Sequence, residues 1–355
     1  MGFGSAAVDR VRAWRVQLEM KQPFSSARSQ IRDRQVVLIR IEAGGNHGWG
    51  EAAPVPGHSR ESIAEIWSNL RSAVADRGVD AHQLVTGMLH AAFSQAKDDL
   101  TAREAGLPLW SLLGGSRRVA ASAAIGTDPG GQPDVLQITS AAQSGYLHMK
   151  LKITPQTDAD RVAAVISEHP DVAFGVDANG SLGMTELPLL LRLDGLGLEY
   201  IEQPGPAGDL DLHVRLCRQL ATPICLDESA RSAPDIDRIV ARGAADIVNL
   251  KAGRFGTRAT LQIASDLAAA ATKARLGGLI ESGIGRAHTA ALAAHPLFSV
   301  VGDIAASDRY FEDDLVRPQW RLDNGYLPLP DNPGIGVTVA ESAVAAAALD
   351  AVATN

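Results

Sequence analysis

The sequence predicts an α/β fold, a modified TIM barrel of the (β/α)7β type with a small α+β domain in front of it. From Arg117 onward, short apolar strands alternate with amphipathic helices, which predicts a parallel sheet. Three acidic residues, Asp177, Glu202 and Asp227, each end an apolar run and are spaced 25 residues apart. That spacing is about one strand, one helix and two loops, so we expect the three acids at successive strand ends, where such barrels carry their active sites.

The first domain is predicted to span residues 1–115 and to contain both strands and helices. Alternating apolar and polar side chains indicate half-buried strands, and stretches rich in Gly, Pro and polar residues indicate loops. Residues 321–355 are irregular before an Ala-rich helix from Glu341, and we expect them to return to this domain. In order, the first domain should contain a strand at 10–19, an exposed loop at 21–34, a strand at 36–43, a Gly/Pro-rich loop at 48–62, and helices at 61–75 and 82–105.

The barrel is predicted at residues 116–320, from eight strands with seven helical stretches between them. Helix starts are indicated by Thr157, Asp209 and Ser232, whose side-chain oxygens suit the N-cap position. The predicted strands are 119–125, 148–153, 172–176, 198–201, 223–226, 246–250, 276–280 and 299–302.

Composition narrows the class of protein. The formal net charge of −8 leaves no basic footprint, so we expect no nucleic-acid partner. No apolar run reaches the roughly 18 residues of a membrane span and the N-terminus lacks the apolar core of a signal peptide, so we expect no membrane partner. Cys217 and Cys225 indicate neither a disulfide framework nor a zinc site, and we expect a cytoplasmic protein. A homo-oligomer is compatible with the sequence, which does not fix the oligomeric state.

A lysine-bearing strand, HMKLKI, precedes the three acids. Alternation along a strand puts Lys150 and Lys152 on one face and Met149 and Leu151 on the other. If the apolar face packs against helices, both lysines point into the barrel, where a charged group needs an opposite charge. The alternative is an edge strand with a solvated lysine face, but the acids on the following strands favour the interior position.

The three acids are candidate metal ligands. Alone, Asp177 or Asp227 would be interpreted as a helix N-cap, but three carboxylates at one rim repel each other unless a cation lies between them. Ligation by oxygen alone favours Mg²⁺, Mn²⁺ or Ca²⁺ over zinc. Because Mg²⁺ keeps positions for water and a substrate anion, we expect Asp177, Glu202 and Asp227 to bind Mg²⁺, with Mn²⁺ as a substitute.

Further candidates lie on later strands. Lys251, 24 residues after Asp227, should stand on the wall opposite Lys152, so that two lysines reach opposite faces of one carbon of a bound carboxylate. The alternative for Lys251 is a Schiff-base lysine, which does not require three metal-binding acids. The seventh predicted strand ends in GGLIESGIGRAH, which places a helix N-terminus suited to a polar or anionic substrate at the rim. The substrate-binding residues expected there are Glu281, Ser282, Gly283 and Ile284.

Five motifs carry a resemblance to a known family: KLK at 150–152, DANG at 177–180, IEQP at 201–204, DES at 227–229 and NLKAGRFGT at 249–257. With these motifs at these spacings, the chain resembles the enolase superfamily and, within it, the muconate-lactonizing-enzyme subgroup. The segments GGLIESGIGRAH and GDIAASDRYFEDDL are similar to those of o-succinylbenzoate synthases and N-acylamino acid racemases. Leu279, where these relatives often have Met, and Thr257, where many have Gly, depart from the pattern.

The resemblance implies an N-terminal capping domain and removal of a proton next to a carboxylate, through an enediolate stabilised by a divalent metal. Lys152 would be the base and Lys150 its helper. Lys251 would stabilise the enediolate or act as a second acid or base. The three acids would bind the metal, and Asn179 of the DANG motif would contact the substrate.

The resemblance implies a small-molecule carboxylate substrate. The most similar segments favour dehydration to o-succinylbenzoate, a step of menaquinone biosynthesis. N-acylamino acid racemase and dipeptide epimerase stay open because they share the same lysines. In this family the capping-domain loops, here 21–34 and 54–62, set the specificity. A different class, an idle barrel that only binds a carboxylate, is disfavoured because buried charges that serve no reaction are costly.

Overall fold

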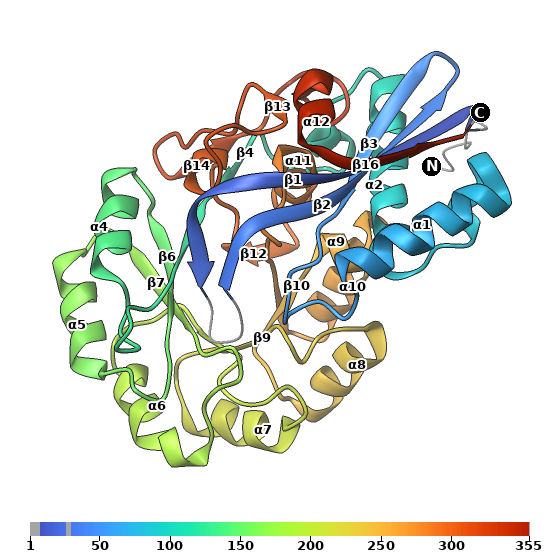
Figure 1. The fold of residues 1–355 in the computed structure, drawn as a ribbon. Helices are drawn as coiled ribbons and strands as arrows, with labels where there is room; N and C mark the ends of the chain where they lie inside the picture. The colour runs from blue at the N-terminus through green and yellow to red at the C-terminus, as the bar shows by residue number, and fades with distance from the viewer. Residues whose placement is uncertain (1–7, 26–29, 355) are drawn as a thin grey trace.

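The computed structural model describes residues 8–25 and 30–354. A barrel of parallel strands ringed by helices forms one part, and a four-stranded antiparallel sheet with helices at its side forms the other (Figure 1). This arrangement confirms the α/β class and the modified TIM barrel with an N-terminal α+β capping domain.

The barrel sheet contains eight parallel strands, and each pairs with the next one in the sequence, from β5 to β12. A backbone hydrogen bond of 3.0 Å from Ser122 N to Ile304 O links the start of β5 to the chain just after β12. The strands are β5 (Ser122–Ile125), β6 (His148–Lys152), β7 (Ala173–Asp177), β8 (Ile201–Glu202), β9 (Ile224–Leu226), β10 (Ile247–Leu250), β11 (Lys273–Leu276) and β12 (Phe298–Val300).

Helices fill each of the seven connections between successive strands, as the (β/α)7β prediction requires. They are α4 (Val135–Gln143), α5 (Ala159–Glu168), η2 (Met184–Glu186) with α6 (Leu187–Asp194), α7 (Leu210–Gln219), α8 (Ala233–Arg242), α9 (Ala252–Phe255) with α10 (Thr257–Ala269), and α11 (Gly283–Ala293).

Two of the three predicted helix starts are confirmed. The Asp209 side chain accepts a hydrogen bond from Leu212 N at the start of α7, and Ser232 caps α8. The prediction of Thr157 as the N-cap of α5 is wrong. Asp158 occupies that position, because the Thr157 hydroxyl is used in the preceding turn, where it accepts from Thr154 N at 2.9 Å.

The predicted seventh strand, 276–280, is wrong in its register, because β11 covers Lys273–Leu276. The apolar run after it contains two glycines where the chain turns over the barrel mouth. A Cβ built on Gly277 would lie 2.3 Å from the Lys251 amine, so a larger residue there would displace this amine. The true strand, KARL, does not look like a strand core in the sequence because Arg275 points a charge into the barrel.

The capping sheet has the order β16-β1-β2-β3. Its strands β1 (Arg10–Ser25) and β2 (Gln30–Ala43) form a hairpin that stays paired up to Ser25 and Gln30, and β3 (Asn46–Ala52) follows. The prediction of an exposed loop at 21–34 is therefore wrong for its two ends, and its central residues 26–29 lie outside the described chain. Near its end the hairpin meets the barrel, where Lys21 N donates to Tyr310 O at 2.9 Å.

Helices pack closely on this sheet. A Cβ on Gly50 would lie 1.9 Å from Ala92 O, so the glycines of the GWG segment let β3 approach α2. Helix α1 opens with a capping box between Ser62 and Glu65. The helices of this region are α1 (Ile63–Arg77), η1 (Gly78–Gln83), α2 (Gly87–Glu104) and α3 (Leu109–Leu112).

The C-terminal segment pairs with the N-terminal one. Helix α12 (Glu341–Ala347) is shorter than the expected Ala-rich helix, and β16 (Ala348–Ala353) follows it antiparallel to β1. The domain boundaries at residues 115 and 320 stay predictions. The remaining elements are the pair β4 (Arg118–Ala120) and β14 (Tyr326–Pro328), the pair β13 (Val316–Arg317) and β15 (Thr338–Val339), and η3 (Ser307–Arg309).

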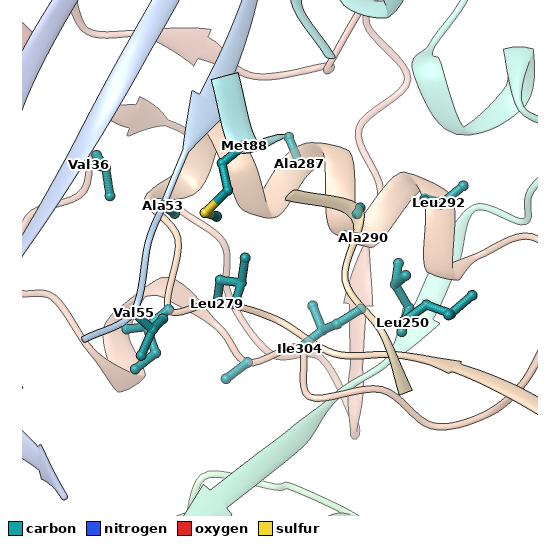
Figure 2. Close-up of a cluster of buried hydrophobic side chains, with 14 of the residues drawn as sticks. Val36, Ala53, Val55, Met88, Leu250, Leu279, Ala287, Ala290, Leu292 and Ile304 are labelled. Atoms are coloured by element: carbon teal, nitrogen blue, oxygen red, sulfur yellow. The ribbon is translucent and has the colours of Figure 1, made fainter. Parts of the chain in front are cut away.

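One contiguous apolar core continues from the capping sheet into the barrel. Figure 2 shows part of it, where Val36 and Val55 of the cap belong to the same cluster as Leu279 and Ile304 of the barrel. The continuous core holds the cap in a fixed position over the strand ends. Among the helices of the described residues, none is both long and apolar enough to cross a membrane.

Candidate active site

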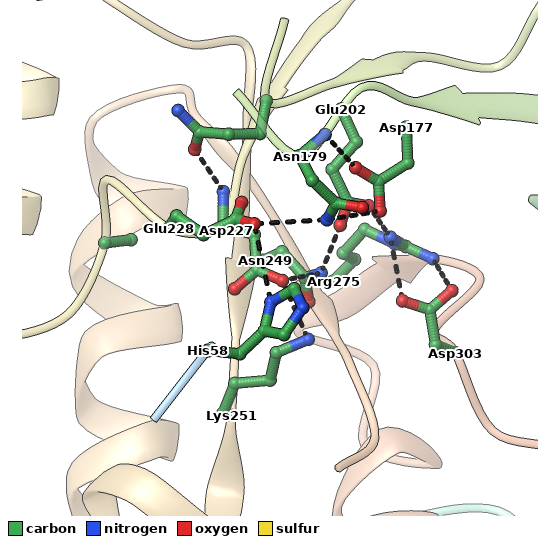
Figure 3. A network of polar contacts seen from close by, with 12 residues as sticks. His58, Asp177, Asn179, Glu202, Asp227, Glu228, Asn249, Lys251, Arg275 and Asp303 are labelled. Atoms are coloured by element: carbon green, nitrogen blue, oxygen red, sulfur yellow. Dashed lines mark hydrogen bonds and ion pairs between the residues drawn. The ribbon is translucent and has the colours of Figure 1, made fainter. Parts of the chain in front are cut away.

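The charged residues predicted from the sequence gather at the carboxyl ends of the barrel strands. We call six of them the charged centre: Lys150, Lys152, Asp177, Glu202, Asp227 and Lys251. Strand register brings the first ones together, because Lys152 lies opposite Asp177 and Asp177 opposite Glu202. Figure 3 shows the three carboxylates with nitrogen-bearing side chains between them.

The two lysines of β6 point into the barrel, as alternation predicted. Lys150 Nζ lies 2.9 Å from Glu202, 3.0 Å from Asp177 and 2.7 Å from Asp303. Burial by itself would lower the pKa of Lys150, but these three carboxylates outweigh it and hold the pKa well above its usual value. Lys150 is therefore a fixed cation. Lys152 Nζ lies 2.7 Å from Asp177, and it also lies near Asn179.

The DANG motif shapes the second lysine's surroundings. Asn179 has a φ of 46°, a left-handed conformation that asparagine tolerates better than most residues. In this turn its backbone N–H donates to Asp177 Oδ1 at 2.8 Å, and its side-chain oxygen accepts from Lys152 Nζ at 2.8 Å. Its amide nitrogen donates to Glu228 at 3.1 Å, which joins the DANG motif to the DES motif.

Lys251 stands across the site, on the wall formed by the end of β10. Its amine lies 3.0 Å from Asp227 Oδ2. Asn249, two residues earlier on the same strand, donates to Glu202 at 3.2 Å and to Asp227 at 3.4 Å. Burial would raise the pKa of Asp227, but the charges of Lys251, Arg254 and Lys150 lower it overall. Opposite walls of the site thus each carry a lysine beside a carboxylate, Lys152 with Asp177 and Lys251 with Asp227.

The sequence reasoning missed two charged residues, the buried Arg275 and the partly buried Asp303. Arg275 of β11 donates to Glu202 and to Asp303, the latter at 2.9 Å, and its guanidinium lies 4.4 Å from the centre of the Tyr200 ring. Despite this cation, burial raises the pKa of Glu202 to about 7. The available signal was period-2 alternation in KARL, which puts Arg275 on the inner face, but the misplaced strand register hid it.

The residues after β11 have two different environments. Glu281 lines the cavity above the charged centre and accepts from the Thr289 hydroxyl at 3.0 Å. Ser282, Gly283 and Ile284 lie outside the set of residues that line this cavity. The Ser282 backbone N–H donates to Glu51 at 3.0 Å, and its hydroxyl donates to the same carboxylate.

Two protein carboxylates and a serine hydroxyl thus already accept hydrogen bonds from the helix N-terminus that was expected to bind an anion. Gly283 N donates to Asp314 at 2.7 Å, Gly285 N to Glu51 at 2.9 Å, and Ile284 N to the Ser282 hydroxyl at 3.2 Å. Substrate contacts from Ser282, Gly283 and Ile284 stay predictions. In this structure the α11 N-terminus joins the barrel to the cap.

The cavity over the charged centre is closed on one side by apolar residues, which we call the apolar wall. Val55 comes from the cap and the others from the barrel, so both parts of the chain shape the cavity. His58, on the same cap loop as Val55, lines the cavity and lies 3.6 Å from Glu228. The members of the apolar wall are Val55, Ala124, Leu279, Ile280, Ile304 and Ala305.

The donor set suits a hard divalent cation. Asp177, Glu202 and Asp227 offer only oxygen atoms, and Glu228 beside them has a buried oxygen, Oε2, that has no hydrogen-bond partner among the described residues. Within the described residues, no three acidic, imidazole or thiol groups are already arranged around a common point. Ammonium and amide nitrogens lie between the carboxylates instead, so a bound cation would take over contacts that lysines make here.

Two parts of the chain match known protein families. Residues 135–343 match the family described as enolase C-terminal domain-like, and residues 8–93 match the MenC N-terminal domain. The chain therefore belongs to the enolase superfamily. It is 34% identical to o-succinylbenzoate synthase of Geobacillus stearothermophilus, over 91% of each chain. It is 32% identical to N-succinylamino acid racemase of Thermus thermophilus, over 91% of this chain and 92% of that one.

Solved structures agree on the fold. An enolase-superfamily member from Listeria innocua superimposes with a TM-score of 0.89 at 30% identity, covering 99% of both chains. A dipeptide epimerase from Cytophaga hutchinsonii, complexed with Mg and a dipeptide, has the same fold at 22% identity and a TM-score of 0.86, over 98% of this chain and 100% of that one. The chain is thus an enzyme of this superfamily, in the branch that contains synthases and racemases.

Proposed function

We propose that this enzyme is an o-succinylbenzoate synthase, which dehydrates a cyclohexadiene carboxylate that carries a succinyl group. The observation that carries the proposal is the pair of lysines on opposite walls of one cavity, each beside a carboxylate. The similarity to curated synthases over nearly the whole chain supports this reaction over others of the superfamily.

We assign the three acids, Asp177, Glu202 and Asp227, to a divalent cation, Mg²⁺ or in its place Mn²⁺. When bound, the ion neutralises negative charge on the substrate carboxylate, which makes the neighbouring proton more acidic. Asn179 and Glu281 would contact the substrate, because both line the cavity.

Lys152 is assigned as the base. In this structure its amine donates to Asp177 and Asn179, and as the base it acts with a lone pair on this nitrogen. The lone pair of Lys152 Nζ then takes the proton from the carbon next to the carboxylate, and the electrons of the broken C–H bond form the enediolate. Lys150, fixed by three carboxylates, stays charged and holds Asp177 in place.

In the second half of the reaction the enediolate loses hydroxide. The enediolate electrons move into the ring and the C–O bond breaks. The leaving hydroxide accepts the proton held by Lys152 and departs as water, and the ring becomes aromatic. Lys251, on the opposite wall, would stabilise the enediolate as its negative charge develops.

N-acylamino acid racemisation is the second candidate. The observation in its favour is Lys251 itself, because a lysine on the opposite wall could return a proton to the other face of the same carbon. Dipeptide epimerisation would use the same pair. Each of these substrates is a small-molecule carboxylate.

Proton NMR in D₂O tests the proposal. The enzyme, with Mg²⁺, is incubated with the diene, N-succinyl amino acids and dipeptides in turn. We expect aromatic product signals from the diene. Loss of α-proton signal from the amino acids or dipeptides, with no aromatic product from the diene, would replace the synthase assignment by the racemase or epimerase. No reaction with any of them would favour an idle barrel.

A further inference from the structure

Arg34, a cap residue, has a fully buried guanidinium, and its hydrogen bonds to the described residues all go to backbone carbonyls. Its side chain leaves β2 and donates from Nε to Ile280 O at 3.0 Å and from Nη2 to Leu279 O at 3.0 Å. Nη1 donates to Pro54 O at 2.6 Å and to Gln35 O at 2.9 Å. One side chain therefore connects β2, the cap loop after β3, and the barrel segment after β11.

Both contacted segments form the apolar wall. Leu279 and Ile280 line the cavity, and Val55 follows Pro54 directly. The positions of these three members of the apolar wall therefore depend on carbonyls that Arg34 holds. Figure 2 shows Val55 and Leu279 in the same buried cluster, where cap and barrel meet.

The Ile280 backbone is strained. Its φ is 55°, in the left-handed region, where a β-branched residue is a genuine outlier. Such strain persists only when the surrounding structure holds it. The Ile280 carbonyl accepts from the Arg34 Nε, and the preceding carbonyl accepts from its Nη2, so the guanidinium is positioned to maintain this conformation.

The arginine also stays charged in this position. Burial lowers the pKa of Arg34 to about 10, and the nearby carboxylates of Glu51 and Glu281 act in the opposite direction. At neutral pH the guanidinium is thus a cation, and its hydrogen bonds to carbonyls are of the stronger, charge-assisted kind.

We propose that Arg34 is a positioning residue for substrate selection: it fixes Leu279, Ile280 and Val55 in the arrangement that accepts the substrate's ring and tail. The charged centre is anchored on other strands and does not depend on it. This inference rests on the proposed function, since it assumes that the cavity above the charged centre takes the substrate.

The first test compares Arg34→Met and Arg34→Lys with the wild-type enzyme. For each we measure kcat and KM for the diene and for N-succinyl amino acids, and Mg²⁺ affinity by calorimetry. Displacing a group that positions the substrate by about 1 Å can lower the reaction rate on the order of 10²-fold. We expect kcat/KM for the preferred substrate to fall about 10- to 100-fold, mostly through KM, and the ratio between the two substrates to change, with Mg²⁺ affinity unchanged. The kcat/KM of Arg34→Lys should lie between those of Arg34→Met and the wild type, because an ammonium keeps the charge but cannot bond to all three segments.

A double-mutant cycle tests the strain directly. Asparagine tolerates positive φ, so Ile280→Asn should keep the backbone conformation without the help of Arg34. The loss in kcat/KM caused by Arg34→Met should be several-fold smaller when Ile280 is already Asn. Arg40→Met serves as the control, because Arg40 lies on the same strand but pairs with Glu341, away from the cavity. Arg40→Met should keep the wild-type ratio of kcat/KM between the diene and the N-succinyl amino acids.

The outcomes separate the possible explanations. An equal loss for both substrates, an unchanged ratio, or an identical loss in the Ile280→Asn background would overturn the proposal for Arg34. If Arg34→Met fails to fold, Arg34→Lys carries the same comparison. Failure of the proposed function appears in the wild-type enzyme alone, as absence of diene turnover, and is thus distinguished from failure of this inference.

Discussion

The charged centre and the apolar wall are two halves of one cavity, and they are built in different ways. The charged centre comes from interior positions at the ends of β6 to β10, each fixed by the backbone register of its own strand. The apolar wall comes from loops of the cap and the barrel, which reach their places through contacts between distant residues such as Arg34 and Ile280. The barrel scaffold thus fixes the chemistry, while loops set the shape that selects the substrate.

Removing the divalent cation should have the largest effect, because it acts on the charged centre as a whole. We expect exhaustive treatment with EDTA to abolish turnover of every substrate, and Mg²⁺ or Mn²⁺ to restore it. Steady-state rates before and after dialysis provide the measurement. Full activity after chelation would contradict the assignment of Asp177, Glu202 and Asp227 as ligands.

Replacing the base, Lys152, should have the second-largest effect on activity. Lys152→Ala is expected to lower kcat by at least about 10²–10⁴-fold, the usual range for loss of a general base or acid. Lys273→Ala is the control, since Lys273 lies on a barrel strand but faces solvent. The α-proton exchange rate in D₂O gives the same comparison without the dehydration step. Retained exchange in Lys152→Ala would show that another group is the base.

Lys251→Ala tests the role of the second lysine in both candidate reactions. We expect racemisation to fall by about 10²–10⁴-fold because a proton donor is lost, and dehydration to fall by about 10²–10³-fold because charge stabilisation is lost. Chiral chromatography and product absorbance measure the two rates. If both rates are unchanged, Lys251 does not face the reacting carbon.

The contact between cap and barrel should have a smaller effect, on stability and not on chemistry. Burial raises the pKa of Glu51 to about 7, above its usual 4.5, although bonds from Ser282 and Gly285 act against this. The folded protein therefore keeps this proton over a pH range where the unfolded chain has lost it, so stability falls as pH rises from about 4.5 to about 7. Glu51→Gln should lose less stability than the wild type between pH 5 and pH 8. If urea unfolding gave the same loss of unfolding free energy between pH 5 and pH 8 for the wild type and Glu51→Gln, this interpretation would be contradicted.

The same contrast explains what the sequence could predict. Period-2 alternation predicted Lys150 and Lys152 inside the barrel, and an even strand–helix period predicted the acids at one rim. Both are regular patterns that can be read along the sequence. The inward position of Arg275 could not be predicted because the apolar run after the true strand, 276–280, has the composition of a strand itself. The role of Arg34 lies in bonds to residues some 245 positions away, which no local pattern encodes.

The most direct test of the account is the ratio of kcat/KM for the succinylated cyclohexadiene carboxylate to that for a panel of N-acyl amino acids and dipeptides, measured on one Mg²⁺-loaded preparation. A synthase with this charged centre and this apolar wall should turn over the diene at least as efficiently as any member of the panel. A kcat/KM for the diene that is orders of magnitude below that for the best N-acyl amino acid or dipeptide would contradict the synthase assignment. It would identify the enzyme as a racemase or epimerase.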